Sequence, residues 1–196
     1  MKVKICGNTR PEDAAYAAQL GADFVGVVMK SEDCSPRSVD VEAAQAVFAA
    51  AGPGVKTVVI THTTHEEDLE EIARARPDYI QMMHPFVIRE DWPWKVIRVI
   101  GRGMAIPDDC DMVAVDESMG AGIPFDPTFA ARIVRESTLP VMLCGGINAE
   151  NVGQAIREVG PAVIDLCSGL EASPGKKDRQ KMNAFCEAVR QATREE

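Results

Sequence analysis

Short apolar runs alternate with longer amphipathic segments along the whole chain. Short runs of apolar, often β-branched residues are typical of buried strands. We predict strands at residues 3–6, 24–29, 55–60, 79–82, 96–100, 112–115, 141–144 and 163–166. The segments between them predict helices at residues 10–20, 41–50, 66–74, 127–136, 149–158 and 178–192. Because the two kinds of element alternate, the strands are expected to pair in parallel.

Eight strands, most of them followed by a helix, predict a compact (β/α)8 TIM barrel that occupies residues 1–196 as one domain. The chain is short for this fold, which typically needs about 250 residues. Reduced or missing helices are expected around the fourth and fifth strands, because segments 84–95 and 101–111 carry proline and glycine and lack a clear helical pattern. A doubly wound open sheet is the alternative architecture.

Composition narrows the classes of function. The chain has 196 residues, 46% of them apolar, and a formal net charge of −9. This charge argues against nucleic acid or an acidic membrane as a general partner, whereas a small anion needs only a local site. No apolar run approaches the roughly 18 residues that span a bilayer, and the first residues fit a strand better than a signal peptide.

The cysteines and histidines indicate a metal-free protein of a reducing compartment. Six cysteines are scattered without a C-x-x-C pair, and there are only three histidines. His62 and His65 lie three residues apart, but such histidines are more often polar loop residues than metal ligands. We therefore expect no metal site, free thiols and a cytoplasmic location.

Two glycine-containing loops follow the seventh and eighth strands. Gly145 and Gly146 come just before a predicted helix, and Ser168 and Gly169 follow the next strand. Glycines let the backbone approach a ligand closely, and the N–H groups at a helix start favour anions. Phosphate-binding barrels often use these two loops. Ordinary glycine turns are the alternative, but two such loops on consecutive strands favour a phosphate site.

Three side chains at other strand ends are candidates for chemistry. Cys6 ends the first strand, where a thiol can act as a base, although a small buried residue would also fit. Asp116 ends an otherwise apolar strand and could serve as an acid, or simply as a loop or capping residue. Arg37 follows the second strand and could clamp a carboxylate, or lie in solvent. Asp126 is better explained as the cap of the helix that begins at Pro127.

These pieces together resemble the phosphoribosylanthranilate isomerase family. The matching stretches run in family order at residues 4–14 (KICGNTRPEDA), 21–23 (GAD), 35–39 (SPRSV), 144–152 (CGGINAENV) and 165–178. The resemblance implies a (β/α)8 fold, no cofactor and an Amadori rearrangement in tryptophan biosynthesis. In that reaction N-(5-phosphoribosyl)anthranilate, an aminoaldose phosphate, becomes an aminoketose phosphate.

The resemblance also implies roles for particular residues. Cys6 would be the general base that takes a proton from sugar carbon 2. Asp116 would be the general acid that protonates the ring oxygen, and Arg37 would hold the anthranilate carboxylate. The phosphate would be bound by Gly145, Gly146, Ser168 and Gly169. The partner is then a small phosphorylated sugar, and the protein is expected to be a monomer or homodimer.

Several positions depart from the family pattern. Ile123 stands where the family usually has lysine, and Pro127 where it has tryptophan; other changes lie at Asn8, Met83, His84 and Met119. These positions fall on the expected catalytic face, whereas the phosphate loops match. Two alternatives therefore stay open: a related barrel that acts on another phosphorylated sugar, and a noncatalytic protein that binds a phosphorylated ligand.

Overall fold

The strands form a closed ring. A computed structural model describes residues 1–31, 35–117 and 124–194. In it, eight parallel strands pair in chain order and β8 pairs back onto β1. The strands are β1 Lys2–Ile5, β2 Phe24–Val28, β3 Lys56–Thr61, β4 Tyr79–Met82, β5 Lys95–Ile100, β6 Met112–Val115, β7 Val141–Leu143 and β8 Val163–Leu166. The predicted (β/α)8 barrel is confirmed, and the alternative of an open sheet is wrong.

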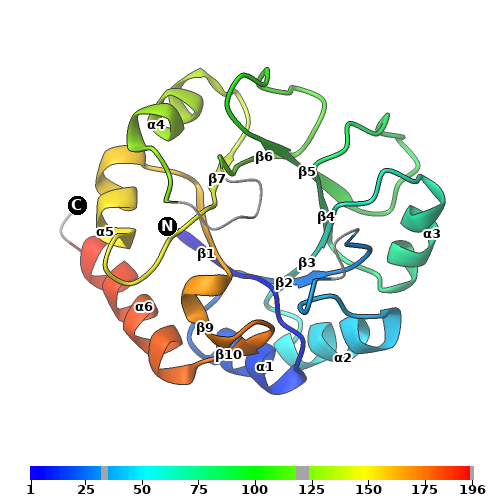
Figure 1. Cartoon of the computed structure of the whole chain (residues 1–196), viewed down its shortest axis with the longest axis horizontal. Helices are drawn as coiled ribbons and strands as arrows, with labels where there is room; N and C mark the ends of the chain where they lie inside the picture. Colours follow the sequence, from blue (N-terminus) through cyan, green and yellow to red (C-terminus); the bar gives the residue numbers. More distant parts are fainter. Residues whose placement is uncertain (32–34, 118–123, 195–196) are drawn as a thin grey trace.

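Helices cover most of the outside of this ring (Figure 1). They are α1 Pro11–Gln19, α2 Val41–Ala51, α3 Glu67–Arg74, α4 Pro127–Glu136 and α6 Arg179–Ala192. The short α5, Val152–Gln154, continues into a π-helical turn at Ala155–Val159. A 3-10 turn at Ser168–Leu170 leads into a small hairpin that the sequence did not predict, with strands β9 Glu171–Ser173 and β10 Lys176–Lys177.

Local sequence explains where several helices begin. Asp126 accepts hydrogen bonds from the amides of Thr128 and Phe129, and therefore caps α4 as predicted. Asp178 caps α6 in the same way. The helix predicted from residue 149 begins later, at Val152, because Asn148 instead closes a turn by accepting from the amides of residues 150 and 151.

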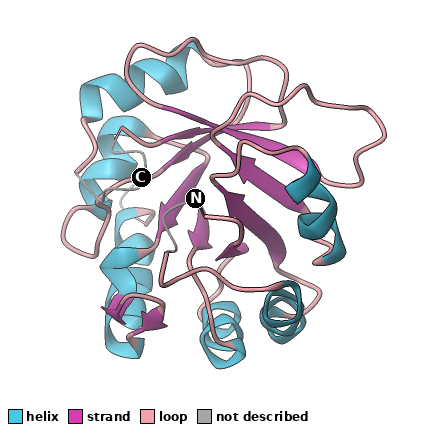
Figure 2. Ribbon diagram, turned by 45° about the vertical axis from the view of Figure 1, so that its right-hand side comes forward, coloured by secondary structure: helices cyan, strands magenta, loops and turns pink. Residues whose placement is uncertain are grey.

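One side of the barrel lacks helices, as expected. Segments 83–94 and 101–111, both described throughout, form turns and loops beside β5 and β6 (Figure 2). Arg98, buried on the outer face of β5, donates hydrogen bonds to the carbonyl oxygens of His84 and Phe86 and pairs with Asp109. Its guanidinium therefore ties both loops to the barrel where a helix would otherwise pack.

The pleat of the strands separates two apolar layers. Outward residues such as Ile5 and Val27 pack under the helices, whereas Phe24, Val28 and their inward counterparts fill the barrel. Successive side chains point to opposite faces of a strand. The inward side of this alternation continues past the carboxyl end of each strand into the loop that follows. The side chains at these inward positions form the site described below.

A buried ion pair lies in the barrel interior. Lys4 on β1 has no exposed surface, and its Nζ lies 2.7 Å from Asp165 Oδ2 on β8 and 2.8 Å from Gln81 Oε1 on β4. Burial is the largest single effect on Lys4 and opposes its charge, but the attractions of Asp165, Cys6 and Cys144 together outweigh it and raise the pKa of the ammonium. The interior thus contains a charge that is satisfied by the adjacent strand β8 and, across the barrel, by β4.

We predict that Lys4→Met destabilises the protein by about 3–5 kcal/mol, because it leaves Asp165 buried without its cation. The free energy of unfolding is measured by urea denaturation. Lys56→Met is the matched control, because Lys56 pairs with Asp78 in an exposed ion pair and its loss should have little effect. Equal effects of the two substitutions would contradict the prediction.

Candidate active site

A cavity of about 530 Å³ opens at the carboxyl ends of the strands. Six of the seven predicted site residues line it, namely Cys6, Arg37, Asp116, Gly145, Gly146 and Ser168. The seventh, Gly169, lies directly behind the wall, because a Cβ at this position would meet the carbonyl oxygen of Ile147 at 2.5 Å. The structure therefore brings together the residues that the sequence placed on five different strand ends.

Cys6 lies immediately after β1 and is buried, with 6% of its surface exposed. Its amide donates to the carbonyl oxygen of Leu166 at 2.8 Å, which extends the β1–β8 pairing by one residue. Gly26 on β2 makes room for the thiol, because a Cβ there would lie 3.0 Å from Cys6 Sγ. The neighbouring strand thus needs a glycine for the thiol to point into the cavity.

The surroundings of Cys6 favour its thiolate. The neighbouring thiol of Cys167 lowers the pKa of Cys6, and this effect outweighs the opposing effect of burial. The ammonium groups of Lys4 and Lys177 lower this pKa further. In contrast, burial and Asp165 raise the pKa of Cys144, whose Sγ lies 3.4 Å from Asp165 Oδ2 in the same cavity. The environments of Cys6 and Cys144 therefore shift the pKa values of these two thiols in opposite directions.

Asp116 follows β6 on the same inward alternation as Met112 and Ala114. Its amide donates to the carbonyl oxygen of Ile100 at 3.0 Å, and its half-buried side chain lines the cavity. Two strands, β7 and β8, separate it from Cys6 around the ring. A carboxyl group and a thiol therefore face one cavity from different sides.

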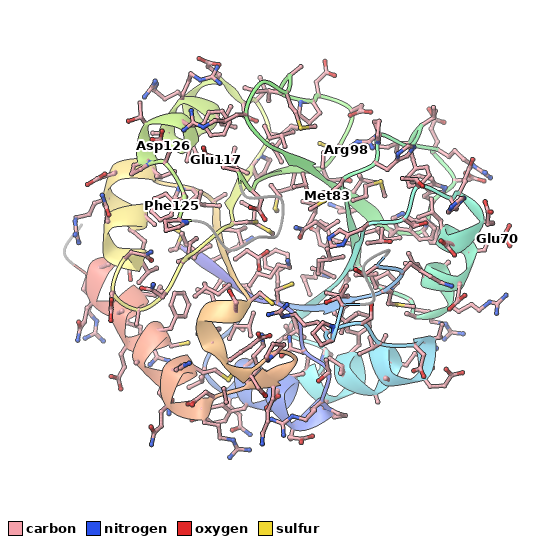
Figure 3. The ribbon with its side chains drawn as sticks, viewed as in Figure 1. Glu70, Met83, Arg98, Glu117, Phe125 and Asp126 are labelled. Carbon is pink, nitrogen blue, oxygen red and sulfur yellow. The ribbon has the colours of Figure 1, made fainter. Side chains whose placement is uncertain are left out.

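A cluster of ion pairs joins the described residues on either side of the range 118–123, which the structure does not describe. Glu117 and Asp126 lie side by side (Figure 3), and the amide of Asp126 donates to Glu117 Oε1 at 2.9 Å. Arg102 forms ion pairs with both carboxylates, at 2.6 Å for Glu117. Met119 and Ile123, two of the positions that depart from the family pattern, lie outside the described residues.

The two glycine loops pack against each other. Gly145 and Gly146 have φ angles of 89° and 58°, which glycine adopts without strain. Asn151 Nδ2 donates to the carbonyl oxygen of Gly146 at 2.9 Å and fixes the turn. Ser168, exposed in the second loop, shares the same wall of the cavity. The geometry offers backbone amides and one hydroxyl to an anion.

Arg37 is held by a partner that sequence reasoning missed. Its Nε and Nη2 lie 2.9 and 2.7 Å from the two carboxylate oxygens of Glu171 in β9. Burial would raise the pKa of Glu171, but Arg37 and Lys177 lower it and keep the carboxylate charged. The sequence did contain a signal that Glu171 belongs to the site, since this residue directly follows the second glycine loop. This pair orients the guanidinium at the cavity wall.

Other cavity residues were also missed as part of the site. Gln81, Asp165, Cys144 and Cys167 line it on the same inward alternation as the predicted residues. Asp165 Oδ1 is buried and has no hydrogen-bond partner among the described residues. In the part of the chain that the structure describes, no three His, Cys, Asp or Glu side chains gather closely enough to hold a metal ion.

Comparisons with known proteins agree with this geometry. A sequence profile of N-(5'-phosphoribosyl)anthranilate (PRA) isomerase matches residues 3–188. The chain belongs to the PRA isomerase family.

Three relatives illustrate the match to the PRA isomerase family. A protein of Methanoregula boonei named N-(5'-phosphoribosyl)anthranilate isomerase is 53% identical over 192 residues, 98% of each chain. The crystal structure of the Thermus thermophilus isomerase is 30% identical, with a TM-score of 0.85, and 97% of this chain covers 99% of that one. A PRA isomerase in complex with reduced 1-(o-carboxyphenylamino)-1-deoxyribulose 5-phosphate is 27% identical, with a TM-score of 0.80 and coverage of 97% and 99%.

The described departures from the PRA isomerase pattern have structural roles. Met83 lines the cavity and lies nearer the barrel axis than Arg98 (Figure 3). His84 packs its ring against Phe86, with centroids 4.5 Å apart. Pro127 begins α4, where its missing N–H costs nothing. Asn8 is buried, and its Nδ2 donates to the carbonyl oxygens of residues 5 and 26.

We predict that Gly169→Ala weakens anion binding about tenfold or more. The added methyl group would press on the carbonyl oxygen of Ile147 and separate the two loops, which loses at least one hydrogen bond to a charged ligand. The inhibition constant of inorganic phosphate measures the change. Gly54→Ala is the control, because nothing lies within 4 Å of its added Cβ. Equal inhibition constants in the two variants would exclude this role of Gly169.

Proposed function

We propose that this chain converts N-(5'-phosphoribosyl)anthranilate to 1-(o-carboxyphenylamino)-1-deoxyribulose 5-phosphate, with Cys6 as general base and Asp116 as general acid. The observation that supports these roles is the shared cavity, which places both groups beside two glycine loops. The acid is needed at the ring oxygen and the base at carbon 2 of one sugar, and two residues on different strands supply them from different sides. Membership of the PRA isomerase family supplies the reaction.

The first step opens the sugar ring. Asp116 gives its proton to the ring oxygen, and the bond between that oxygen and carbon 1 breaks. The lone pair of the anthranilate nitrogen forms a C=N bond to carbon 1, so the electrons that leave with oxygen are replaced. The loops that follow β7 and β8 would hold the phosphate during this change.

The second step moves the proton that changes an aldose derivative into a ketose derivative. The Cys6 thiolate takes the proton from carbon 2, the C–H electrons form a C=C bond, and the C=N electrons return to nitrogen. The enolamine then loses its hydroxyl proton and gains one at carbon 1, which gives the ketone. A thiol can act as this base because the neighbouring thiol and ammonium groups lower its pKa.

Other cavity groups suit the rest of the substrate. Glu171 holds Arg37 in a fixed orientation, so its guanidinium is ready for a carboxylate such as that of anthranilate. Asp165 Oδ1, which has no hydrogen-bond partner in the described part of the chain, can accept a hydrogen bond from a sugar hydroxyl. Gly145, Gly146, Ser168 and Gly169 would surround the phosphate. Each charged or polar part of the substrate then has a group of matching chemistry.

We also propose that the protein acts as a monomer or homodimer in the cytoplasm, on a small phosphorylated sugar and without a cofactor. The five described cysteines are free, which suits a reducing compartment. None of the helices in the described ranges is long and apolar enough to cross a membrane. Sedimentation of the purified chain tests the oligomeric state.

We predict that Cys6→Ala and Asp116→Asn each lower kcat by about 10²–10⁴-fold, because each removes one proton-transfer group. The assay follows the fluorescence of the anthranilate ring with freshly made substrate. Circular dichroism spectra should match that of the unmodified protein. Cys110→Ser is the control, because Cys110 is not among the residues that line the cavity.

The outcomes separate the open alternatives. Full activity in Cys6→Ala would end the assignment of the base. Binding of phosphate without turnover in the unmodified protein would favour the noncatalytic alternative. Turnover of another phosphorylated sugar, but not of the anthranilate derivative, would favour the related barrel with a different substrate.

We predict that Arg37→Ala raises KM about tenfold or more for the anthranilate substrate, because it removes the cation that would hold the carboxylate. The same rearrangement with an aniline derivative, which lacks the carboxylate, should be changed much less. Measuring both substrates separates loss of a carboxylate contact from general damage to the cavity. Equal increases in KM for the two substrates would contradict the assignment.

A further inference from the structure

Three charged side chains meet beside the cavity. Glu171 in β9 has 4% of its side-chain surface exposed, and it lies between two cations. Arg37 Nη2 is 2.7 Å from Glu171 Oε2, and Lys177 Nζ is 3.2 Å from Glu171 Oε1. The proposed reaction uses Arg37 and its partner Glu171 but leaves Lys177 without a role.

The small hairpin positions Lys177 for this contact. Glu171 in β9 and Lys177 in β10 are opposite each other in the antiparallel register, which brings their side chains together. Gly175 has a φ of 80°, and its amide donates to Glu171 Oε1 at 3.3 Å. An added Cβ at Gly175 would lie 2.9 Å from the carbonyl oxygen of Pro36, so the hairpin packs against the segment that carries Arg37.

The side chain of Lys177 is fully buried, which is costly for a charged group. Its Nζ contacts Glu171 and donates to the carbonyl oxygen of Cys167 at 3.1 Å. An apolar side chain of similar length would fill the same space without the cost of removing a charge from water. The position therefore indicates a use for the charge of Lys177 and not only for its volume.

The formal charges of the three side chains add to a net positive charge. Arg37 and Glu171 alone would cancel, and a neutral pair attracts a carboxylate much less than a free guanidinium does. Arg37 directs Nε and Nη2 at Glu171, and its Nη1 makes no hydrogen bond to any residue in the described ranges. That amino group can donate to a ligand, and its attraction for an anion depends on the charge of the whole cluster.

We propose that Lys177 offsets the charge of Glu171 and so preserves the attraction of Arg37 for the carboxylate of the substrate. This inference rests on the proposed binding of the anthranilate carboxylate by Arg37. Glu171 can then fix the orientation of the guanidinium without cancelling its charge. Lys177 is a positioning residue, because it acts through Glu171 and is not among the residues that line the cavity.

Other charged groups near the hairpin are engaged elsewhere. Asp13 accepts from the amide of Lys177 at 3.2 Å, but Arg10 already pairs with this carboxylate at 2.7 Å. Lys181 is exposed and donates to the main-chain carbonyl oxygen of Glu171, not to its carboxylate. Within the part of the chain that the structure describes, Lys177 is therefore the lysine that pairs with the Glu171 carboxylate.

The test measures binding and needs no turnover. Two unreactive analogues of the product are used, both with the ketone reduced to an alcohol, one with the ring carboxylate and one without it. We predict that Lys177→Met weakens binding of the first analogue to the whole chain about tenfold and of the second much less, because the cluster around Arg37 becomes neutral. Calorimetry gives the two dissociation constants.

Lys176→Met is the matched control. Lys176 precedes Lys177 in the same strand, and its side chain is exposed. The substitution removes the same formal charge from the protein, but from a position where solvent and salt screen it. Both dissociation constants should stay close to those of the unmodified protein.

A double substitution separates the charge of Lys177 from its packing. Glu171→Gln together with Lys177→Met removes one charge of each sign, so the cluster regains the net charge of Arg37. Glutamine also keeps an oxygen that accepts from the guanidinium. We expect the double variant to recover most of the affinity for the analogue with the carboxylate. A role in packing alone predicts further loss, because two buried side chains are then altered.

Two results would overturn this inference while leaving the proposed reaction in place. One is that Lys177→Met binds both analogues as Lys176→Met does. The other is that the double variant stays as weak as Lys177→Met. If Lys177→Met does not fold, as judged by circular dichroism, the double variant decides: a preference for the carboxylate like that of the unmodified protein supports the inference, and a lost preference overturns it.

Failure of the proposed function gives a different pattern. If the preference for the carboxylate falls in Lys177→Met and returns in the double variant, but the unmodified protein does not convert the substrate, the charge role stands and the proposed reaction fails. If the unmodified protein binds both analogues equally, the carboxylate role of Arg37 and this inference fail together. Binding of neither analogue would overturn the inference and the proposed function alike.

Discussion

The buried ammonium of Lys4 ties together the strands on which the site depends. It has no exposed surface, and its partners lie on β4 and β8, so its charge is satisfied only when the ring is closed. Cavity residues then follow two positions further along each strand: Cys6 after Lys4, and Cys167 after Asp165. The alternation that directs Lys4 and Asp165 into the barrel therefore also directs the cysteines two residues further on into the cavity.

The sequence was sufficient for the barrel and for most of the predicted site because both follow from local patterns. Apolar runs mark strands, and the residue after each run lies at one common face of a parallel barrel. On that basis Cys6, Asp116 and Gly145 could be predicted to share a cavity without any long-range contact being known.

The features of the site that could not be predicted depend on residues that lie far apart in the chain. Arg37 and Glu171 are separated by 134 residues, and nothing near Arg37 indicates that a carboxylate already holds it. Cys167 lies next to Cys6 only because of the β1–β8 register, which closes the ring between the two ends of the chain. The later start of α5 reflects competition, because Asn148 closes a turn with its side chain instead of capping the helix.

Arg98 has a consequence for how stability is distributed over the barrel. Its guanidinium bonds fasten segments 83–94 and 101–111 to β5, where no ladder of helical hydrogen bonds covers the strand. Backbone amides held by a few side-chain contacts exchange with solvent through small local openings, whereas amides in packed helices require larger ones. Deuterium should therefore enter this flank of the ring first, while the opposite flank, where α1 and α6 pack, stays protected.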